Sequence, residues 1–187
     1  MRVAQETALL STCTKKYVGA VLVRSGRILS TGYNGAPSKI THCTKESCLR
    51  PISGDNIGSE LCKGVHAEIN TIIQCALHGI QIGENSKIFC THFPCMSCTK
   101  TLINIGIKDI IFKNDYEMDN IEKFKLINEA NIDVYKFSWA MKTDEATKLG
   151  VNKNIYIMKF FDVKKHINNI KKGSKETIWS KIAKSTF

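Results

Sequence analysis

The sequence lacks the long apolar runs that membrane-spanning segments need. No stretch of its 187 residues approaches the roughly 20 consecutive apolar side chains that cross a bilayer. The first residues, Met1 to Thr7, lack the layout of a secretory signal peptide, and no internal repeat or low-complexity tract stands out. We therefore expect a cytoplasmic protein without membrane association, long enough to bury a core and close a pocket.

The sequence also lacks the marks of a disulfide scaffold, although it contains 8 cysteines. Secreted scaffolds of that kind are mostly shorter than about 80 residues and carry an export signal. Clustered cysteines in this chain therefore favour metal binding, and Cys95 and Cys98 form a C-x-x-C pair. Cys75 and Cys90 stand among apolar neighbours, and we interpret them as ordinary buried cysteines.

The net charge of +10 resides mostly in the C-terminal part of the chain. Residues 1–140 hold 16 basic and 13 acidic side chains, whereas residues 141–187 hold 11 and 4. The basic tail is either a solvated appendage or a surface that contacts a polyanion or another partner. The modest charge of the larger part argues against a nucleic-acid-binding protein.

Helical and strand periodicities alternate in the order αββαβαβαβ. The predicted helices are Val3–Ser11, His66–His78, Cys95–Ile105 and Asn120–Ala130, and the predicted strands are Val18–Val23, Arg27–Tyr33, Lys87–Thr91, Lys108–Lys113 and Ile132–Phe137. This alternation predicts a three-layer α/β/α domain over residues 1–137, with a mixed, mainly parallel five-stranded sheet in which only the first hairpin is antiparallel. Residues 138–187 form a basic C-terminal extension, with one more strand over 154–161 and a short helix over 163–170.

Two short stretches carry the chemistry, His66-Ala67-Glu68 and the Pro94 to Cys98 segment, and each is predicted to open a helix. Together they match H-x-E…P-C-x-x-C, the signature of zinc deaminases. Cys95 and Cys98 are three residues apart, so both sulfurs leave one face of the helix, whose dipole favours their thiolate forms. His66 supplies a third ligand and leaves one tetrahedral position for water, as in catalytic zinc sites.

Glu68 is the predicted catalytic acid and base. Residues two apart on a helix do not share a face, so Glu68 lies beside the metal rather than on it. Zn²⁺ lowers the pKa of a bound water towards about 7. Glu68 then takes a proton from that water and passes it to the ring nitrogen and the leaving ammonia.

Residues 3–137 resemble the cytidine/deoxycytidylate deaminase superfamily, and within it the deoxycytidylate (dCMP) deaminases and their competence-operon relatives. Besides the zinc motif, the resemblance is carried by Val18-Gly19-Ala20-Val21, Ser30 to Pro37, Val65 to Asn70, and Ile105-Gly106-Ile107-Lys108. It implies a cytidine-deaminase-like fold, hydrolysis of dCMP to dUMP, homo-oligomers, and in many members control by dCTP and dTTP. It also implies substrate contacts from Asn34, Tyr33, Gly35, His66 and Ala67, with Asn34 on the sugar.

The sequence departs from the family where Thr91-His92-Phe93-Pro94-Cys95 replaces the usual T-L-S-P-C. His92 is a pocket donor, a tunable acid or an exposed side chain, and the residues alone do not choose. Phosphate binding needs basic or backbone donors near the pocket. The candidates are Arg24, Arg27, Lys39 and Arg50.

A second zinc site is predicted in the long connection between Asn34 and Val65. This stretch has little periodicity and is far longer than the usual connection of about 4 to 6 residues, so it needs a function or a staple. Cys43, Cys48 and Cys62 lie in it, and Cys13 would complete four thiolates, with His42 competing for one place. Some phage-type dCMP deaminases are similar in carrying a structural zinc with ligands matching positions 13 and 43; four reduced cysteines without metal are the alternative.

Three function classes therefore compete. The first is a deaminase of a small nucleotide, with dCMP as the favoured substrate. The second is a tRNA or single-strand deaminase that flips a base into the same zinc pocket and uses the basic tail for phosphates. The third is a zinc-organised binding module without turnover.

Overall fold

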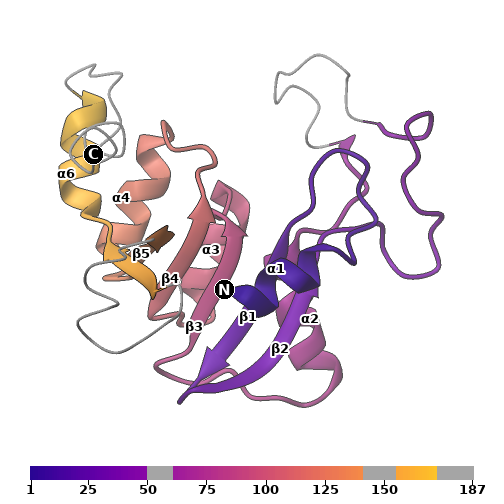
Figure 1. Cartoon of the computed structure of the whole chain (residues 1–187), viewed down its shortest axis with the longest axis horizontal. Helices are drawn as coiled ribbons and strands as arrows, with labels where there is room; N and C mark the ends of the chain where they lie inside the picture. Colours follow the sequence, from indigo (N-terminus) through magenta and orange to yellow (C-terminus); the bar gives the residue numbers. More distant parts are fainter. Residues whose placement is uncertain (50–60, 141–154, 172–187) are drawn as a thin grey trace.

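The fold is a six-stranded mixed sheet with helices against both of its faces. A computed structural model describes residues 1–49, 61–140 and 155–171 of the chain. The strands lie in the order β2-β1-β3-β4-β5-β6 (Figure 1). In chain order the elements are α1 (Arg2–Ala8), β1 (Gly19–Arg24), β2 (Arg27–Tyr33), α2 (Ala67–Leu77), β3 (Lys87–His92), α3 (Met96–Asn104), β4 (Asp109–Asn114), α4 (Ile121–Glu129), β5 (Asp133–Ala140), β6 (Ile155–Phe160) and α6 (Val163–Lys171). Every helix and strand that the sequence predicts is present.

The strand directions differ from the prediction in one respect. β3, β4 and β5 pair in parallel, and β1 and β2 form an antiparallel hairpin, so the mixed five-stranded core is confirmed. However, β1 is also antiparallel to β3, and β5 to β6. The expectation that only the first hairpin would be antiparallel is therefore wrong. The reason is that α2 joins β2 to β3, which lie on either side of β1, and a crossover makes parallel only the two strands that it joins.

One face of the sheet is covered by α1 near the first hairpin. The hairpin turns at Ser25 and Gly26, whose φ angles of 51° and 75° are those of a two-residue turn. Gly19 lies where α1 crosses β1, and a Cβ there would collide with the backbone of Ala4. Ala4 is fully buried. The missing side chain at Gly19 thus lets the helix lie directly on the strand.

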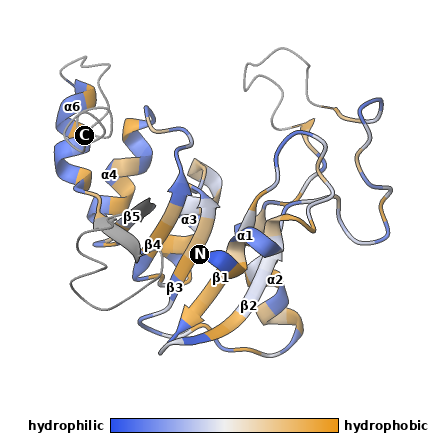
Figure 2. Cartoon of the chain, in the orientation of Figure 1, coloured by the Kyte–Doolittle hydropathy of each residue, from blue (hydrophilic) through white to orange (hydrophobic). Residues whose placement is uncertain are grey.

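The opposite face carries the main hydrophobic core. Successive side chains of a strand point to opposite faces, and alternate residues of the strands join one buried cluster: Ala20, Leu22, Ile88, Cys90, Ile110, Phe112 and Val134. Helices α2, α3 and α4 supply Cys75, Leu102 and Phe124 to the same cluster. Hydrophobic residues dominate β1, β3 and β4 in Figure 2. Cys75 and Cys90 are therefore core cysteines, as predicted.

Gly32 brings the first turn of α2 against β2. A Cβ on Gly32 would collide with the carbonyl oxygen of Ala67 and with the side chain and amide of Thr71. Ser30 Oγ donates a hydrogen bond of 2.9 Å to the carbonyl oxygen of Thr71. The start of α2, which carries the His66-Ala67-Glu68 motif, is thereby held on the sheet.

Residues 155–171 complete the same sheet and core. β6 pairs along β5, and α6 packs against α4. The rings of Phe161 and Phe124 lie 5.8 Å apart. The sequence places these residues in an extension that begins at residue 138, whereas β5 itself continues to Ala140. The rest of the basic tail, 141–154 and 172–187, lies outside the described residues. None of the helices in the described ranges is long and apolar enough to cross a membrane.

Candidate active site

Two helix N-termini meet near the end of β3. His66 is the N-cap residue of α2, and Cys95 is the N-cap residue of α3. Both have extended backbone conformations, with ψ angles of 153° and 170°. The prediction that each motif opens a helix is therefore confirmed. The positive ends of both helix dipoles face this point, which favours anionic groups there.

The side chains of His66, Cys95 and Cys98 converge into a set suited to a metal ion. Nδ1 of His66 lies 3.4 Å from Sγ of Cys95 and 3.3 Å from Sγ of Cys98. Ligands about 2.0 to 2.3 Å from a tetrahedral zinc ion stand roughly 3.6 Å from one another, so the three donors fit zinc. Within the described ranges, no other group of three or more His, Cys, Asp and Glu side chains brings its ligand atoms within 4.8 Å of one another.

The thiols of this set favour a negative charge. The pKa of Cys95 is lowered to about 4, first by a hydrogen bond with the Cys98 thiol and then by a hydrogen bond with His66, although burial opposes this. The same hydrogen bond and burial raise the pKa of Cys98. Cys95 is therefore the thiol that ionises more readily, and a bound divalent ion favours the thiolate form of both sulfurs.

Glu68 lies beside these ligands and is not one of them. Its side chain is 4% exposed. Burial raises the pKa of its carboxyl group, while a backbone hydrogen bond and the charge of His66 act in the opposite direction. A raised pKa makes the carboxylate a stronger base, which favours its taking a proton from water in general base catalysis.

A cavity that is partly open to solvent lies over the metal-binding set. Its lining includes nine residues that the sequence predicted as site residues: Asn34, Gly35, His66, Ala67, Glu68, Cys95, Cys13, Cys43 and Cys62. It also includes seven that the sequence left without an assigned role: Lys16, Val18, Gly64, Val65, His92, Phe93 and Tyr116. Tyr33, by contrast, lines a neighbouring hollow together with Lys39 and His42.

Asn34 is fixed by the segment before β1. Its Oδ1 accepts hydrogen bonds of 2.8 Å from the amide of Val18 and 2.7 Å from Oγ of Ser11. Its Nδ2 donates one of 2.8 Å to the carbonyl oxygen of Lys16. An amide group has two donor and two acceptor positions, so these bonds use three of the four. The remaining N–H is the group with which Asn34 can contact a ligand.

Gly35 joins the two ends of the long connection. Its amide donates to the carbonyl oxygen of Val65 at 3.1 Å, and the amide of Val65 donates back at 2.8 Å. Because Val65 directly precedes His66, this pair places the predicted sugar-binding segment next to the metal ligand. A Cβ on Gly35 would collide with the hydroxyl group of Thr12.

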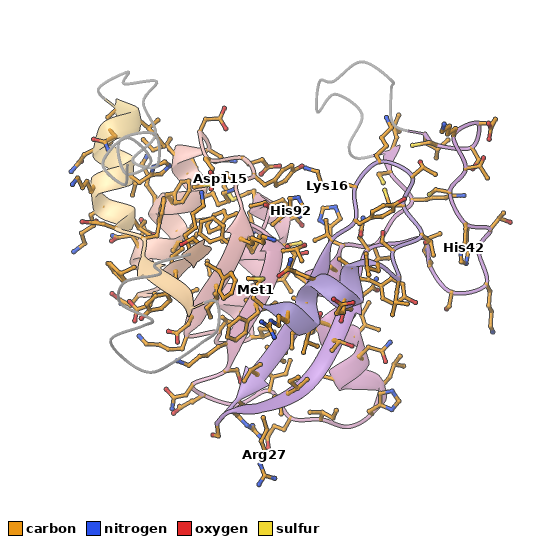
Figure 3. The ribbon with its side chains drawn as sticks, in the orientation of Figure 1. Met1, Lys16, Arg27, His42, His92 and Asp115 are labelled. Carbon is orange, nitrogen blue, oxygen red and sulfur yellow. The ribbon has the colours of Figure 1, made fainter. Side chains whose placement is uncertain are left out.

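Three of the four candidate phosphate ligands, Arg24, Arg27 and Lys39, do not line the cavity. Arg24 donates to the carbonyl oxygen of Gln81 at 2.9 Å, and Lys39 lines the neighbouring hollow. Figure 3 shows Arg27 at the far end of the first hairpin, whereas Lys16 and His92 point into the region of the cavity. Arg50 lies outside the described residues. Lys16 is the basic side chain that the sequence missed, because no motif distinguishes it from the adjacent Lys15.

His92 and Phe93, the two departures from the family pattern, occupy different environments. His92 lines the cavity, and burial, with a smaller contribution from Lys16, lowers its pKa to about 4. His92 is half-buried, so the interpretation of it as an exposed side chain is wrong, whereas its roles as a pocket donor or a tunable acid stay predictions. Phe93 is 1% exposed, and its ring centroid lies 4.7 Å from that of Phe112 and 5.4 Å from that of Phe124.

Three of the four cysteines of the predicted second zinc site line the same cavity. They are Cys13, which precedes β1, and Cys43 and Cys62 from the long connection. The amide of Lys15 donates to Sγ of Cys13 at 3.5 Å, and the amide of Gly64 donates to Sγ of Cys62 at 3.4 Å. The four thiols are not drawn together as tightly as the His66 set. His42 lies on the outer loop in Figure 3, away from the cavity.

Sequence comparison identifies the family. Residues 1–114 match the family described as "Cytidine and deoxycytidylate deaminase zinc-binding region". The chain belongs to this family. The matched region contains both helix N-termini, and therefore all three residues of the metal-binding set together with Glu68. The zinc cofactor that the motif predicts is thus supported by both the family and the geometry.

Proteins similar to this chain include deoxycytidylate deaminases and a ComE operon protein. Deoxycytidylate deaminase of Saccharomyces cerevisiae is 34% identical over 139 residues, which cover 74% of this chain and 44% of that protein. ComE operon protein 2 of Bacillus subtilis is 38% identical over 110 residues, which cover 59% of this chain and 54% of that protein. The chain thus spans about half the length of these relatives. The crystal structure of dCMP deaminase from the cyanophage S-TIM5 in complex with dCMP and dUMP is 29% identical, with a TM-score of 0.59, and the match covers 72% of this chain and 91% of that one.

Proposed function

We propose that this protein is a zinc-dependent dCMP deaminase, which converts dCMP and water to dUMP and ammonia and so supplies the precursor of dTMP. The observation that carries the proposal is the convergence of His66, Cys95 and Cys98 beside the buried carboxyl group of Glu68 in one cavity. Similarity to a phage dCMP deaminase whose structure contains dCMP and dUMP supports the substrate.

In the proposed reaction, His66, Cys95 and Cys98 hold the zinc ion at one end of the cavity. When bound, zinc supplies the Lewis acidity that makes water nucleophilic near neutral pH. Glu68 accepts a proton from the attacking water and delivers it to the ring nitrogen. Glu68 then transfers the second proton of the water to the exocyclic amine as the C–N bond breaks, so that ammonia leaves and a carbonyl group remains. Asn34 and Gly35 orient the sugar.

Lys16 is proposed to bind the phosphate of the nucleotide. Among the described residues that line the cavity it is the only lysine or arginine. Its Nζ lies 4.3 Å from the ring centroid of Tyr116, another lining residue, which holds the ammonium at the mouth of the cavity. An ammonium there attracts a phosphate as a point charge. Lys16 would therefore favour dCMP over deoxycytidine.

A second, structural zinc ion held by Cys13, Cys43, Cys48 and Cys62 is also proposed. It is supported by the two amide-to-sulfur hydrogen bonds at Cys13 and Cys62, since such bonds stabilise thiolates that ligate metals. The thiols also affect one another: burial raises the pKa of Cys43, and Cys13, Cys62 and Cys48 add to that rise. Zinc would draw them together and staple the long connection beside the active site.

The test of the main proposal is ammonia release from cytidine, deoxycytidine, CMP, dCMP and dCTP by the zinc-loaded protein. We expect the highest kcat/KM for dCMP. Release only from a polymer substrate, with binding that weakens steeply as salt rises, would indicate a nucleic-acid deaminase instead. No ammonia release from the five small compounds or from a polymer substrate would indicate a binding module without turnover.

Family resemblance supports three further proposals, namely homo-oligomerisation, activation by dCTP with inhibition by dTTP, and a cytoplasmic location. The assay above, repeated with each nucleoside triphosphate at low concentration, tests the regulation. Light scattering on the same preparation tests the oligomeric state.

A further inference from the structure

A buried lysine lies directly behind the metal-binding loop, and the proposed reaction does not use it. Lys123, in α4, is 0% exposed. A buried ammonium loses its hydration and is retained only where several acceptors surround it. Burial lowers its pKa to about 8, with Glu117 acting in the opposite direction. Because an apolar residue would fill this space at lower cost in free energy, the partners of Lys123 indicate its role.

The ammonium group of Lys123 holds the peptide in front of Cys95. Its Nζ donates hydrogen bonds of 3.2 Å to the carbonyl oxygen of Pro94 and 3.1 Å to that of Tyr116. Pro94 is the residue immediately before the metal ligand Cys95. Lys123 therefore links the start of α4 to the loop that carries the ligand.

The carboxylate of Glu117 holds the peptide that follows Cys95. Its Oε2 lies 3.8 Å from Nζ of Lys123 and accepts a hydrogen bond of 3.3 Å from the amide of Met96, the first residue of α3. The φ angle of Glu117 is 48°, in the left-handed region, which non-glycine residues enter at a cost in free energy. Both peptide units that flank Cys95 are thus held, one by Lys123 in α4 and the other by Glu117 in the segment before α4.

Phe93 completes this arrangement from within the core. Nζ of Lys123 lies 4.7 Å from the centroid of the Phe93 ring, which packs against Phe112 and Phe124. The aromatic side chain at this departure from the family pattern gives the ammonium a favourable surface in addition to its oxygen partners. The unusual residue before the ligands and the buried lysine therefore belong to one structural unit.

We propose that Lys123 and Glu117 form a clamp on the two peptide units beside Cys95, and that this clamp sets the position of the Cys95 sulfur for metal binding. Lys123 is then a positioning residue rather than a catalytic one. The inference rests on the metal centre of the proposed function but not on the identity of the substrate. The competing explanation is that Lys123 only supports the core around α4.

The test measures metal binding and folding separately in variants of the full chain. Lys123→Met keeps the length of the side chain and removes the charge and both hydrogen bonds. Lys125→Met is the matched control, since Lys125 lies in the same helix and forms an exposed ion pair with Glu122. Each protein is titrated with zinc against a chelator, substituted with Co²⁺ for visible spectroscopy, and unfolded by heat without metal.

We expect Lys123→Met to bind zinc about 10 to 100 times more weakly, the range found for groups that support metal ligands. Its Co²⁺ spectrum should be altered, whereas Lys125→Met should match the parent in both respects. A Lys123→Met protein with parental zinc affinity and Co²⁺ spectrum but a lower melting temperature would overturn the clamp and leave a purely structural lysine. Loss of deamination with parental zinc affinity and Co²⁺ spectrum would also overturn the clamp, and would instead bear on the proposed reaction.

Variants of Glu117 test the clamp independently, so the test does not depend on whether Lys123→Met folds. Glu117→Gln keeps an oxygen that accepts from the Met96 amide, whereas Glu117→Ala removes it. We expect Glu117→Gln to retain most of the zinc affinity. Glu117→Ala should bind zinc more weakly than the parent, by about the same factor as Lys123→Met. Equal zinc affinity in Glu117→Gln, Glu117→Ala and the parent would overturn the clamp.

Discussion

Nδ1 of His66 lies 3.3 Å from Sγ of Cys98, although 32 positions separate the two residues in the chain. His66 precedes α2 and Cys98 lies in α3, so the distance depends on how each helix is seated on the sheet. The position of α2 on the sheet depends on Gly32, because a side chain at that position would collide with α2. The metal site is therefore coupled to close packing of a helix on a strand.

Gly32→Ala should weaken both folding and metal binding. The added Cβ collides with the backbone of Ala67 and the side chain of Thr71, so α2 must move and carry His66 with it. Overpacking of this kind destabilises by about 1 to 3 kcal/mol. Urea unfolding and zinc competition measure the two effects. Thr31→Ala, at an exposed neighbour in β2, is the control and should change neither quantity. Zinc binding by Gly32→Ala as tight as that of the parent would show that close packing of α2 on β2 is not required for metal binding.

Glu68→Gln should bind zinc as tightly as the parent protein and lose nearly all turnover. Glutamine keeps the size of the side chain, which is not among the metal ligands, but it cannot carry protons. The expected loss in kcat is at least about 10² to 10⁴-fold. Metal analysis and ammonia release measure the two effects, with Glu84→Gln, at an exposed site, as the control. Retention of most activity would exclude Glu68 as the proton carrier.

Lys16→Gln should raise KM for dCMP by about 10 to 100-fold, because one charged hydrogen bond to phosphate contributes roughly 1.5 to 3 kcal/mol. The kcat/KM for deoxycytidine, which has no phosphate, should stay within a few-fold of the parent value. Lys15→Gln is the control, since Lys15 does not line the cavity. A parallel loss for both substrates would mean that Lys16 shapes the cavity without binding phosphate.

The stability of the protein should rise with pH through the range in which Lys123 loses its proton. Burial lowers the pKa of Lys123 from 10.5 to about 8 in the folded state, so between these values the unfolded chain binds more protons. The contribution of Lys123 to the free energy of unfolding therefore increases from pH 8 towards 10.5, by up to about 3 kcal/mol, and is constant below pH 8. Urea unfolding at pH 7.5 and pH 10 should show this gain in the parent and not in Lys123→Met. An equal gain in both would place the titration elsewhere.

Elemental analysis should find close to two zinc ions per chain. Removing one thiolate from the proposed structural site, by Cys48→Ser or Cys62→Ser, should reduce this to about one and lower the melting temperature. Cys75→Ala, which removes a core cysteine, is the control and should still contain two zinc ions per chain. One zinc ion in the parent, unchanged in Cys48→Ser and Cys62→Ser, would refute the second site.

The sequence alone determined the local elements and singled out the three side chains that converge as candidate metal ligands. Helix and strand periods are set by residues within a few positions of one another, so every predicted element appears in the structure with small shifts at its ends. The ligand motif is also local, because two thiols three positions apart must share a face of α3. His66 and Glu68 followed from the same signature, since their roles depend on chemistry and spacing.

Only the tertiary structure decided what depends on distant segments. The direction of β3 relative to β1 follows from the position of β1 between β2 and β3 in the sheet. Local periodicity of the sequence does not predict this strand order. Lys16 enters the cavity because the segment before β1 is held by Asn34. Lys123 is buried among partners from two separate loops, those before α3 and before α4. In sequence both are ordinary lysines, and burial and partners, which are set by packing, distinguish them.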